Sequence, residues 1–398
     1  MSEFVLPISL DWLIIGGGIH GVHIAASLIG EAGVAAEKVC IVDPAARLLD
    51  RWRSCTDTTG MTHLRSPSVH HLDIDPWSLQ HFARKGKRRK RGLLVGQYGR
   101  PALTLFNSHC DKVVETFGLS ELHIQDRAVT IRVECDGVRV ELASGSELIA
   151  RNLVLAIGAG DQPNWPEWAP QDHDCVHHIF EPGFDAWPTE PETVAVVGGG
   201  ISSAQVSIRL VEEGHKVYLI SRHSLREHIF DSDPGWLGPR NMHGFRRVRD
   251  FNRRRVLIDD ARHRGSMPPG VRHAVRRAMM NKQLRWHEDV VESIDIQDNN
   301  LKLKLGTQEH LEVHRVLLAT GFSSKRPGGA LVDGLIASSS LPCAECGYPV
   351  VDTDLRWHPN VYVSGPLAEL ELGPVSRNIA GARRAATRLV DSLRTARA

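Results

Sequence analysis

One pattern of apolar and small residues occurs twice in the chain. At residues 13–21 an apolar run leads into three consecutive glycines and then into apolar positions at helical spacing. Residues 194–204 repeat this order 182 positions later, counted from Gly16 to Gly198 (198 minus 16), with Ser203 in place of the third spaced glycine. A strand, Gly-x-Gly-x-x-Gly and a helix in succession form the entry to a dinucleotide-binding βαβ unit. The pattern therefore predicts two such units in one polypeptide.

Glycine is needed in this loop for three separate reasons. Gly16 lets the chain turn sharply, Gly18 lets backbone N–H groups approach a pyrophosphate, and Gly21 lets the helix pack closely on the strand. The phosphates then lie at the positive end of the helix. The residues expected to hold the two dinucleotides are Gly16, Gly18, Ile19, His20 and Gly21 in the first unit and Gly198, Gly200, Ile201, Ser202 and Ser203 in the second.

The end of the second strand distinguishes the two units. In the first unit the apolar run 39–42 ends at Asp43, whose carboxylate can accept the hydroxyl protons of an adenosine ribose. An acid at this place favours a ribose without a 2′-phosphate. In the second unit the run 216–220 ends in Ser221 and Arg222, and a guanidinium suits a 2′-phosphate. The sequence therefore predicts that the second unit binds NADPH rather than NADH.

Each unit is followed by short alternating runs that predict a small antiparallel meander, and then by a buried strand that stops at a glycine. The meanders are expected at 122–148 and 289–316, the second with a turn at 299–300, and the buried strands at 152–156 and 316–318. Amphipathic helices are expected at 103–117 and, at the end of the chain, at 379–393. The chain thus reads as an α/β protein.

Composition narrows the class of protein. Lys and Arg number 48 and Asp and Glu 47, so the net charge of +1 does not imply nucleic acid or an anionic membrane as a partner. The sequence contains no uncharged apolar stretch of about 18 residues to span a bilayer. Seven scattered cysteines, an odd number, are typical of reduced thiols in a cytoplasmic protein. The sequence is compatible with a monomer and with a homo-oligomer.

Three polar segments call for an interpretation. His70 and His71, with two aspartates close behind, match no zinc spacing, so no metal site is expected. The cation run at 84–91 has no interleaved aromatic residue for stacking on bases and is expected to form a solvated loop. The arginine-rich segment 246–277 is expected to form helices whose arginines mostly face solvent.

With both glycine units, both strand–glycine stops and the closing strand and helix, the chain resembles the two-dinucleotide-domain flavoproteins. Within these it is most similar to the flavin-containing and N-hydroxylating (lysine/ornithine-type) monooxygenases, over nearly its whole length. The motifs that carry the resemblance are residues 16–21 with Asp43, residues 198–203 with Arg222, residues 319–321, and residues 360–386. Two departures are present. The aromatic fingerprint before the second unit survives only loosely at 177–180, and Gly365 is followed by Pro366 rather than by the Asp of disulfide reductases.

The resemblance implies FAD in the first unit, NADPH in the second, and two Rossmann-like domains with the NADPH domain inserted in the FAD domain. Residues 1–184 and the return segment 319–398 would form the FAD-binding domain, and residues 185–318 the NADPH-binding domain. Further cofactor-binding residues would be Thr320, Gly321, Gly365 and Ser376. The start of the last helix near Ser376 would face the pyrimidine edge of the flavin, where its positive end stabilises the reduced ring.

The implied activity is that of an NADPH-dependent monooxygenase. O₂ adds to the flavin C4a carbon, and a small amine or sulfur substrate attacks the distal oxygen of this C4a-peroxyflavin. The resemblance assigns no catalytic side chain. Trp52, Met61 and Arg65, on the loop that follows the second strand, are expected close to the flavin. The substrate itself has no sequence signal.

Two other functions remain open. One is a dithiol or disulfide oxidoreductase that uses Cys343 and Cys346, and the other is a flavin redox sensor without turnover. The cysteine pair follows the second meander. In the disulfide reductases the pair lies soon after the second strand of the FAD unit or inside the NADPH domain. We therefore predict that Cys343 and Cys346 are not the redox centre.

Overall fold

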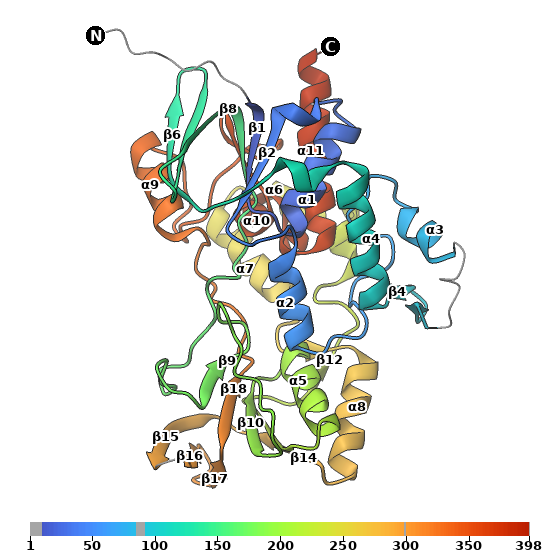
Figure 1. Ribbon diagram of the computed structural model, residues 1–398, viewed down its shortest axis with the longest axis vertical. Helices are drawn as coiled ribbons and strands as arrows, with labels where there is room; N and C mark the ends of the chain where they lie inside the picture. Colours follow the sequence, from blue (N-terminus) through green and yellow to red (C-terminus); the bar gives the residue numbers. More distant parts are fainter. Residues whose placement is uncertain (1–9, 85–91, 298–299, 398) are drawn as a thin grey trace.

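The computed structural model describes residues 10–84, 92–297 and 300–397, and its two large sheets lie at opposite ends of the long axis (Figure 1). The first sheet has the strand order β19–β20–β8–β1–β2–β5, and the hairpin β6–β7 continues from β8. Its strands are β1 (Leu10–Ile15), β2 (Val39–Asp43), β5 (His123–Gln125), β6 (Ala128–Glu134), β7 (Gly137–Leu142), β8 (Glu147–Leu155), β19 (Arg356–His358) and β20 (Val361–Val363).

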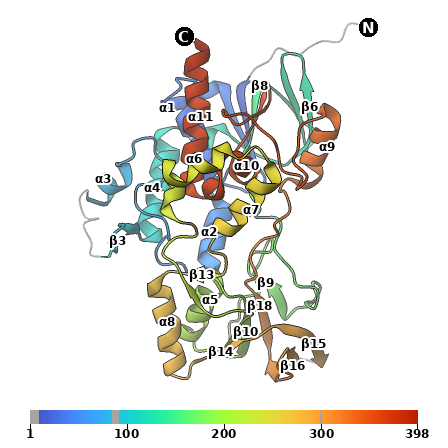
Figure 2. The same cartoon turned by 180° about the vertical axis from the view of Figure 1, so that it is seen from behind.

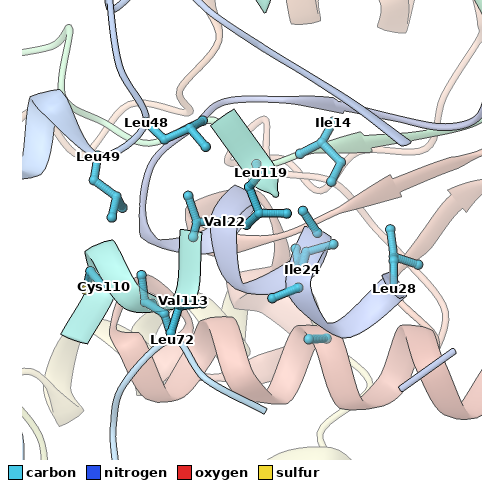
Figure 3. Close-up of a cluster of buried hydrophobic side chains, with 14 of the residues drawn as sticks. Ile14, Val22, Ile24, Leu28, Leu48, Leu49, Leu72, Cys110, Val113 and Leu119 are labelled. Atoms are coloured by element: carbon cyan, nitrogen blue, oxygen red, sulfur yellow. The ribbon is translucent and has the colours of Figure 1, made fainter. Parts of the chain in front are cut away.

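Strand β1 is the centre of this first unit, because it pairs in parallel with β2 on one side and with β8 on the other. Its last four residues are buried, as expected for a parallel strand covered on both faces. The chain then enters α1 (Ile19–Gly30), which packs against α4 (Leu103–Thr116) and α11 (Ile379–Arg397). Figure 3 shows Val22, Ile24 and Leu28 of α1 in the resulting core.

The second sheet repeats this plan with the strand order β14–β11–β10–β18–β9, in which all pairings are parallel. Its elements are β9 (Val176–His178), β10 (Thr193–Val197), β11 (Lys216–Ser221), β14 (Leu284–Glu288) and β18 (Arg315–Leu318), with α5 (Ile201–Glu212) and α8 (Pro269–Met280) beside them. The predicted α/β class with two Rossmann-like units is confirmed. The domain boundaries stay a prediction. Strand β9 pairs with β18 in the second sheet, although the predicted boundary at residue 184 assigns it to the FAD-binding domain.

The predicted meanders are correct in part. In the first, β6, β7 and β8 pair antiparallel, but β5 pairs in parallel with β2 at the edge of the sheet, so its place in the meander is wrong. Alternation alone does not tell a hairpin strand from an edge strand of a parallel sheet. The second meander is confirmed as β15 (Val291–Gln297), β16 (Asn300–Leu305) and β17 (His310–Val313). Residue 299 of the predicted turn and residues 85–91 of the cation run lie outside the described residues.

Shorter elements connect and cover the two sheets. They are α2 (Asp50–Thr58), α3 (Ser78–Arg84), α6 (Pro239–Arg247), α7 (Phe251–Ala261), α9 (Gly329–Ser339), α10 (Glu369–Leu372), β3 (Leu94–Val95), β4 (Arg100–Pro101), β12 (Arg226–Glu227), β13 (Ser266–Met267), and the single turns η1 (Ala36–Lys38), η3 (Leu119–Leu122), η4 (Pro234–Leu237), η5 (Gly365–Ala368) and η6 (Pro374–Arg377). Among the described residues, no helix combines the length and the apolar character needed to cross a membrane. The predicted helix at 103–117 is confirmed as α4.

The first glycine loop generates a stability prediction. A Cβ at residue 21 would lie 1.8 Å from the carbonyl oxygen of Gly16, whereas a Cβ at residue 18 would meet no atom within 4 Å. We expect Gly21→Ala to lower the free energy of unfolding by about 1–3 kcal/mol or more, since backbone must move. The matched change Gly18→Ala should cost less than about 1 kcal/mol. Urea unfolding of both variants measures the difference, and equal losses would contradict the geometry.

Six histidines that are buried or half-buried predict a pH dependence of stability. Burial is the largest cause that lowers the pKa of His20, His70, His71, His109 and His178 to about 4 and of His23 to about 3. Because these folded values lie below the unfolded value of 6.5, the unfolded chain binds more protons in the window between them. Their contribution is fully present above pH 6.5 and is lost as the pH falls toward 4.

Urea unfolding between pH 7 and pH 5 measures this loss. Each such histidine contributes a slope of up to about 1.4 kcal/mol per pH unit in this window. The variant His23→Gln should flatten the slope, and His310→Gln, at an exposed position, should leave it unchanged. Equal slopes in all three proteins would show that His23 titrates normally.

Candidate dinucleotide sites and the junction between them

The first glycine loop is shaped by close backbone contacts. Gly16 has a φ of +112°, and its N–H donates to the carbonyl of Val42 at 2.8 Å. A Cβ at Gly16 would lie 2.6 Å from the carbonyl oxygen of Ala156, the residue after β8. Packing therefore excludes a side chain at Gly16 and at Gly21. Gly18, by contrast, faces open space at the N-terminus of α1, where Ile19 is the first helical residue.

Asp43 lies beside this loop at the end of β2. One carboxylate oxygen accepts a hydrogen bond from the N–H of Gly17 at 2.6 Å, and the other accepts from the N–H of Ala45 at 2.9 Å. An ionised carboxylate has about four lone-pair sites. Two of these remain for a ligand, and the two backbone bonds fix the position of the carboxylate.

His20 joins the glycine loop to the return segment. Its Nδ1 lies 2.8 Å from the Oγ of Ser364, a fully buried residue after β20. Its Nε2 is buried and has no hydrogen-bond partner among the described residues. Burial lowers the pKa of His20 to about 4, against a smaller opposing effect of the backbone of Arg377 and Asn378, so the ring is neutral at pH 7. An unsatisfied buried nitrogen is uncommon, and it fits a site that a bound group completes.

Gly365 and Ser376, two of the predicted cofactor-binding residues, lie next to His20. Gly365 has a φ of +63°, and a Cβ there would lie 3.7 Å from the imidazole ring. Ser376 is fully buried and donates from Oγ to the carbonyl of Gly365 at 2.6 Å. It lies in η6, just before α11 begins. The structure thus brings the first loop and the return segment together, and it adds Ser364, whose only sequence signal was its place before Gly365.

The second glycine loop has the same construction. Gly198 has a φ of +150°, and a Cβ there would lie 2.4 Å from the carbonyl oxygen of Ala319, the residue after β18. Ser203 donates from Oγ to the carbonyl of Gly200 at 2.9 Å, so serine fits where the first loop has a glycine. A Cβ at Gly200 would lie 3.7 Å from the Cα of Gly265. A close approach of backbone to the carbonyl after a neighbouring strand therefore shapes each loop.

Arg222 directly follows β11 and is exposed. Ile201 and Ser202 form the first turn of α5 and are half-buried. Sequence reasoning missed His223. Its ring lies against the loop, because a Cβ at Gly199 would come within 2.6 Å of the imidazole Cε1. Its position next to a strand-end arginine was the only signal that could have found it.

Thr320 and Gly321 lie where the two connectors between the sheets meet. Thr320 donates from Oγ1 to the carbonyl of Asn164 at 2.5 Å, and the N–H of Asn164 donates to the carbonyl of Gly321 at 2.9 Å. Gly321 has a φ of +79°. These residues therefore bind the outgoing and the returning connector to one another.

Trp52 and Met61, expected near the flavin, lie partly in the first core. Trp52 packs on Phe106 with ring centroids 5.5 Å apart, and its Nε1 donates to Asn107 at 3.1 Å. Met61 is half-buried and packs against the same core. The polar group of Trp52 is thus satisfied within the protein.

Two arginines join the units, and one of them is the third residue expected near the flavin. Arg65 donates to the carbonyls of residues 228–230 at 2.7–3.0 Å. Arg51, next to Trp52 in the sequence, donates from Nη2 to the carbonyls of Gly160, at 2.6 Å, and Phe180. Both guanidinium groups therefore bind backbone of the connectors or of the second unit.

The prediction that the arginines of segment 246–277 face solvent is wrong for part of the segment. Arg254 is only 9% exposed and pairs with Glu371 at 3.0 Å, and Arg255 pairs with the fully buried Glu369. The prediction is correct for Arg246, Arg247, Arg249, Arg253, Arg276 and Arg277, which are exposed. Two acids alternating with leucines in an otherwise apolar stretch were the signal that could have revealed the buried pairs.

Comparison with known proteins agrees with this architecture. The family model described as pyridine nucleotide-disulphide oxidoreductase matches residues 13–256, more than half of the chain, so the protein belongs to this family. An uncharacterised oxidoreductase, CzcO of Bacillus velezensis, is 24% identical over 324 residues, which cover 79% of this chain and 81% of that protein.

Solved structures match nearly the whole chain. Ornithine hydroxylase PvdA of Pseudomonas aeruginosa superposes with a TM-score of 0.77 at 18% identity, covering 97% of this chain and 99% of that one. Ornithine N-hydroxylase KtzI of Kutzneria sp. 744, solved with reduced FAD, NADP⁺ and L-ornithine, gives 0.79 at 17% identity, with 98% and 100% covered. Bacillithiol disulfide reductase Bdr of Bacillus cereus gives 0.63 at 17% identity, with 97% and 99% covered. The fold is that of the FAD- and NADPH-dependent oxidoreductases.

Proposed function

We propose that this protein is an FAD-dependent, NADPH-consuming monooxygenase that oxygenates a small nucleophilic substrate, an amine or a sulfur compound. The observation that carries the proposal is the whole-length match to two ornithine hydroxylases at TM-scores of 0.77 and 0.79. Ornithine is an amine, which favours the amine alternative for the substrate of this chain.

The first unit has the features that FAD requires. The space at Gly18 and the N-terminus of α1 would take the pyrophosphate, and the remaining lone pairs of Asp43 the ribose. The unsatisfied Nε2 of His20, together with Gly365 and Ser376, would complete the site on the side of the return segment. Bound FAD would supply the electron transfer and the activation of O₂.

The chain itself would bind, orient and exclude water. The N-terminus of α11, just after Ser376, would place the positive end of a helix at the pyrimidine edge of the flavin. Ser364 and Ser376 are fully buried and Val375 is nearly so, so this side of the site is shielded from water. Orientation of two reactants and exclusion of water require no catalytic acid, base or nucleophile of the protein.

The second unit would hold NADPH. Gly200 and Ser203 at the start of α5 would face the pyrophosphate, and Arg222 would pair with the 2′-phosphate. In domain terms, residues 1–184 and 319–398 would bind FAD and residues 185–318 NADPH.

A dithiol oxidoreductase is the second candidate, because the family includes such enzymes and Cys343 and Cys346 have the spacing of a redox pair. Both thiols are free. Cys343 is exposed and forms an isolated antiparallel bridge with Pro349. Partial desolvation of the Cys343 side chain raises the pKa of its thiol. A reactive thiol typically has a lowered pKa, so Cys343 lacks this feature of a redox cysteine.

The first prediction from this proposal concerns FAD affinity. Asp43→Ala should weaken FAD binding roughly 10- to 150-fold, since loss of a charge-assisted hydrogen bond costs about 1.5–3 kcal/mol. Titration of the apoprotein by flavin fluorescence gives the dissociation constant, with the exposed Asp161→Ala as the control. A change of less than about twofold in Asp43→Ala would show that this carboxylate does not bind the ribose.

Coenzyme choice is a second prediction. The parent should prefer NADPH to NADH, and Arg222→Ala should reduce that preference by about tenfold or more, because a charge-assisted phosphate contact is lost. Arg285→Ala, an exposed change on β14, is the matched control. Steady-state rates with both coenzymes decide the matter, and equal use of NADH by the parent would contradict the role of Arg222.

The oxygenase is tested by measuring NADPH oxidation and O₂ consumption with a library of amines and thiols. The expected result is joint consumption, stimulated by one substrate that gains an oxygen atom by mass. The double variant Cys343→Ser, Cys346→Ser should retain this activity. Turnover that needs no O₂ and disappears in a folded, FAD-loaded double variant would establish the dithiol enzyme instead.

A further inference from the structure

The middle segment of the chain forms an arm that crosses from the second unit to the first. It leaves the second sheet after β11 and returns to it at β14, and it carries α6 and α7. We call residues 239–262 the arm. Its helices lie in front of α10 and α11 in Figure 2, and its inner face buries Met242, Phe245 and Ile258.

Glu369, the first residue of α10, fastens this arm. Its side chain is fully buried, and Arg255 of α7 donates from Nη1 to its Oε1. From the return segment, Arg377 donates to it from Nε at 2.5 Å and from Nη2 at 3.0 Å. Burial acts to raise the pKa of Glu369, but Arg377, Arg262 and Arg255 outweigh burial and lower it. The carboxylate is therefore ionised and binds guanidinium groups of both units at once.

Glu371, two residues further on, makes a second fastening of the same kind. Arg254 of α7 donates to its carboxylate at 3.0 Å and to the carbonyl of Leu370 at 2.9 Å. Arg388 of α11 donates to the other carboxylate oxygen at 2.9 Å. A buried ion pair tolerates the loss of one member poorly, because the remaining charge has no water to solvate it. The arm is thus held to the first unit by buried ion pairs.

The arm also contacts the turn at 373–378, which precedes α11. Arg262 donates to the carbonyl of Pro374 at 3.0 Å. Asp231, which precedes the arm in the same segment, accepts from Asn378 at 3.2 Å. Arg377, bound to Glu369, is itself part of this turn. Glu369 therefore stands between the arm of the second unit and the turn that, under the proposed function, faces the flavin.

We propose that the arm fixes the orientation of the NADPH-binding unit toward the flavin, and that Glu369 is the positioning residue of this device. The inference rests on the proposed function, because it concerns the step in which NADPH passes a hydride, two electrons and one proton, to FAD and leaves as NADP⁺. Such a step needs donor and acceptor within about 3–3.5 Å, so small displacements of one unit have large effects on its rate. Glu369 acts on that rate without touching either cofactor.

The test is stopped-flow reduction of the FAD-loaded variant Glu369→Gln, which keeps the shape of the side chain and removes its charge. We expect reduction by saturating NADPH to slow by about tenfold or more. Reduction by dithionite, a small reductant that needs no second unit, should stay within about twofold of the parent, as should the FAD dissociation constant. A merely structural role would alter all three readouts together.

The matched control is Glu292→Gln, which removes the same charge from an exposed ion pair with Lys304 on the second meander. It should leave every rate unchanged. If Glu369→Gln does not fold, Arg255→Lys replaces it, since it keeps the charge but loses the planar contact with the carboxylate. Unchanged NADPH reduction in the folded variant, or parallel loss of dithionite reduction and FAD affinity, would overturn the inference.

Hydrogen exchange separates this inference from the proposed function. In the parent, amides of α7 should exchange slowly without any coenzyme, and Glu369→Gln should accelerate their exchange by about tenfold or more, while those of α4 stay unchanged. If NADPH does not reduce the parent, the proposed function fails, and the exchange experiment still reports on the arm. If α7 exchanges alike in parent and variant, Glu369 does not fasten the arm and the inference fails by itself.

Discussion

The structure depends on a contact between two backbones that occurs once in each unit. The chain makes this contact where it leaves the first strand of the unit. A Cβ at Gly16 would lie 2.6 Å from the carbonyl oxygen of Ala156, and a Cβ at Gly198 would lie 2.4 Å from that of Ala319. Only glycine allows this approach with a positive φ. The approach lets the following helix begin directly over the sheet, and the helix N-terminus becomes an anion site. Both proposed dinucleotide sites follow from this one steric condition.

A second constraint acts between the units and is electrostatic. Glu369 and Glu371 lie in the interior and accept hydrogen bonds from arginines that are more than a hundred residues apart in the sequence. Buried carboxylates are costly unless they are paired and hydrogen-bonded. The guanidinium groups of α7 and of the return segment meet that requirement together, so the position of one unit on the other is specified by charge as well as by apolar contact.

The family name refers to disulfide chemistry, but the match that shows the family does not extend to the cysteine pair. Membership of the pyridine nucleotide-disulphide oxidoreductases follows from residues 13–256, which contain both glycine loops but not Cys343 or Cys346. The family match therefore describes the binding of two dinucleotides. The side chains that meet at the first loop are His20, Ser364 and Ser376, which are hydrogen-bonding groups rather than thiols. Such a site can hold a cofactor and shield it from water. The substrate that reaches the bound cofactor then determines the reaction.

The sequence by itself determined the two glycine loops, their order, the acid and the arginine at the strand ends, and the α/β class, because local backbone geometry demands particular residues at fixed spacing. Tertiary structure decided the partners of isolated polar residues. Arg65 binds carbonyls at 228–230, and its expected place near the flavin stays a prediction, whereas Arg255 was expected in solvent and instead binds Glu369. Strand β5 joined the parallel sheet rather than a hairpin. Each of these outcomes depends on contacts between residues 80 or more positions apart in the sequence. The local sequence does not predict them, because the partner of a charge or of a strand is set by which residues are neighbours in space.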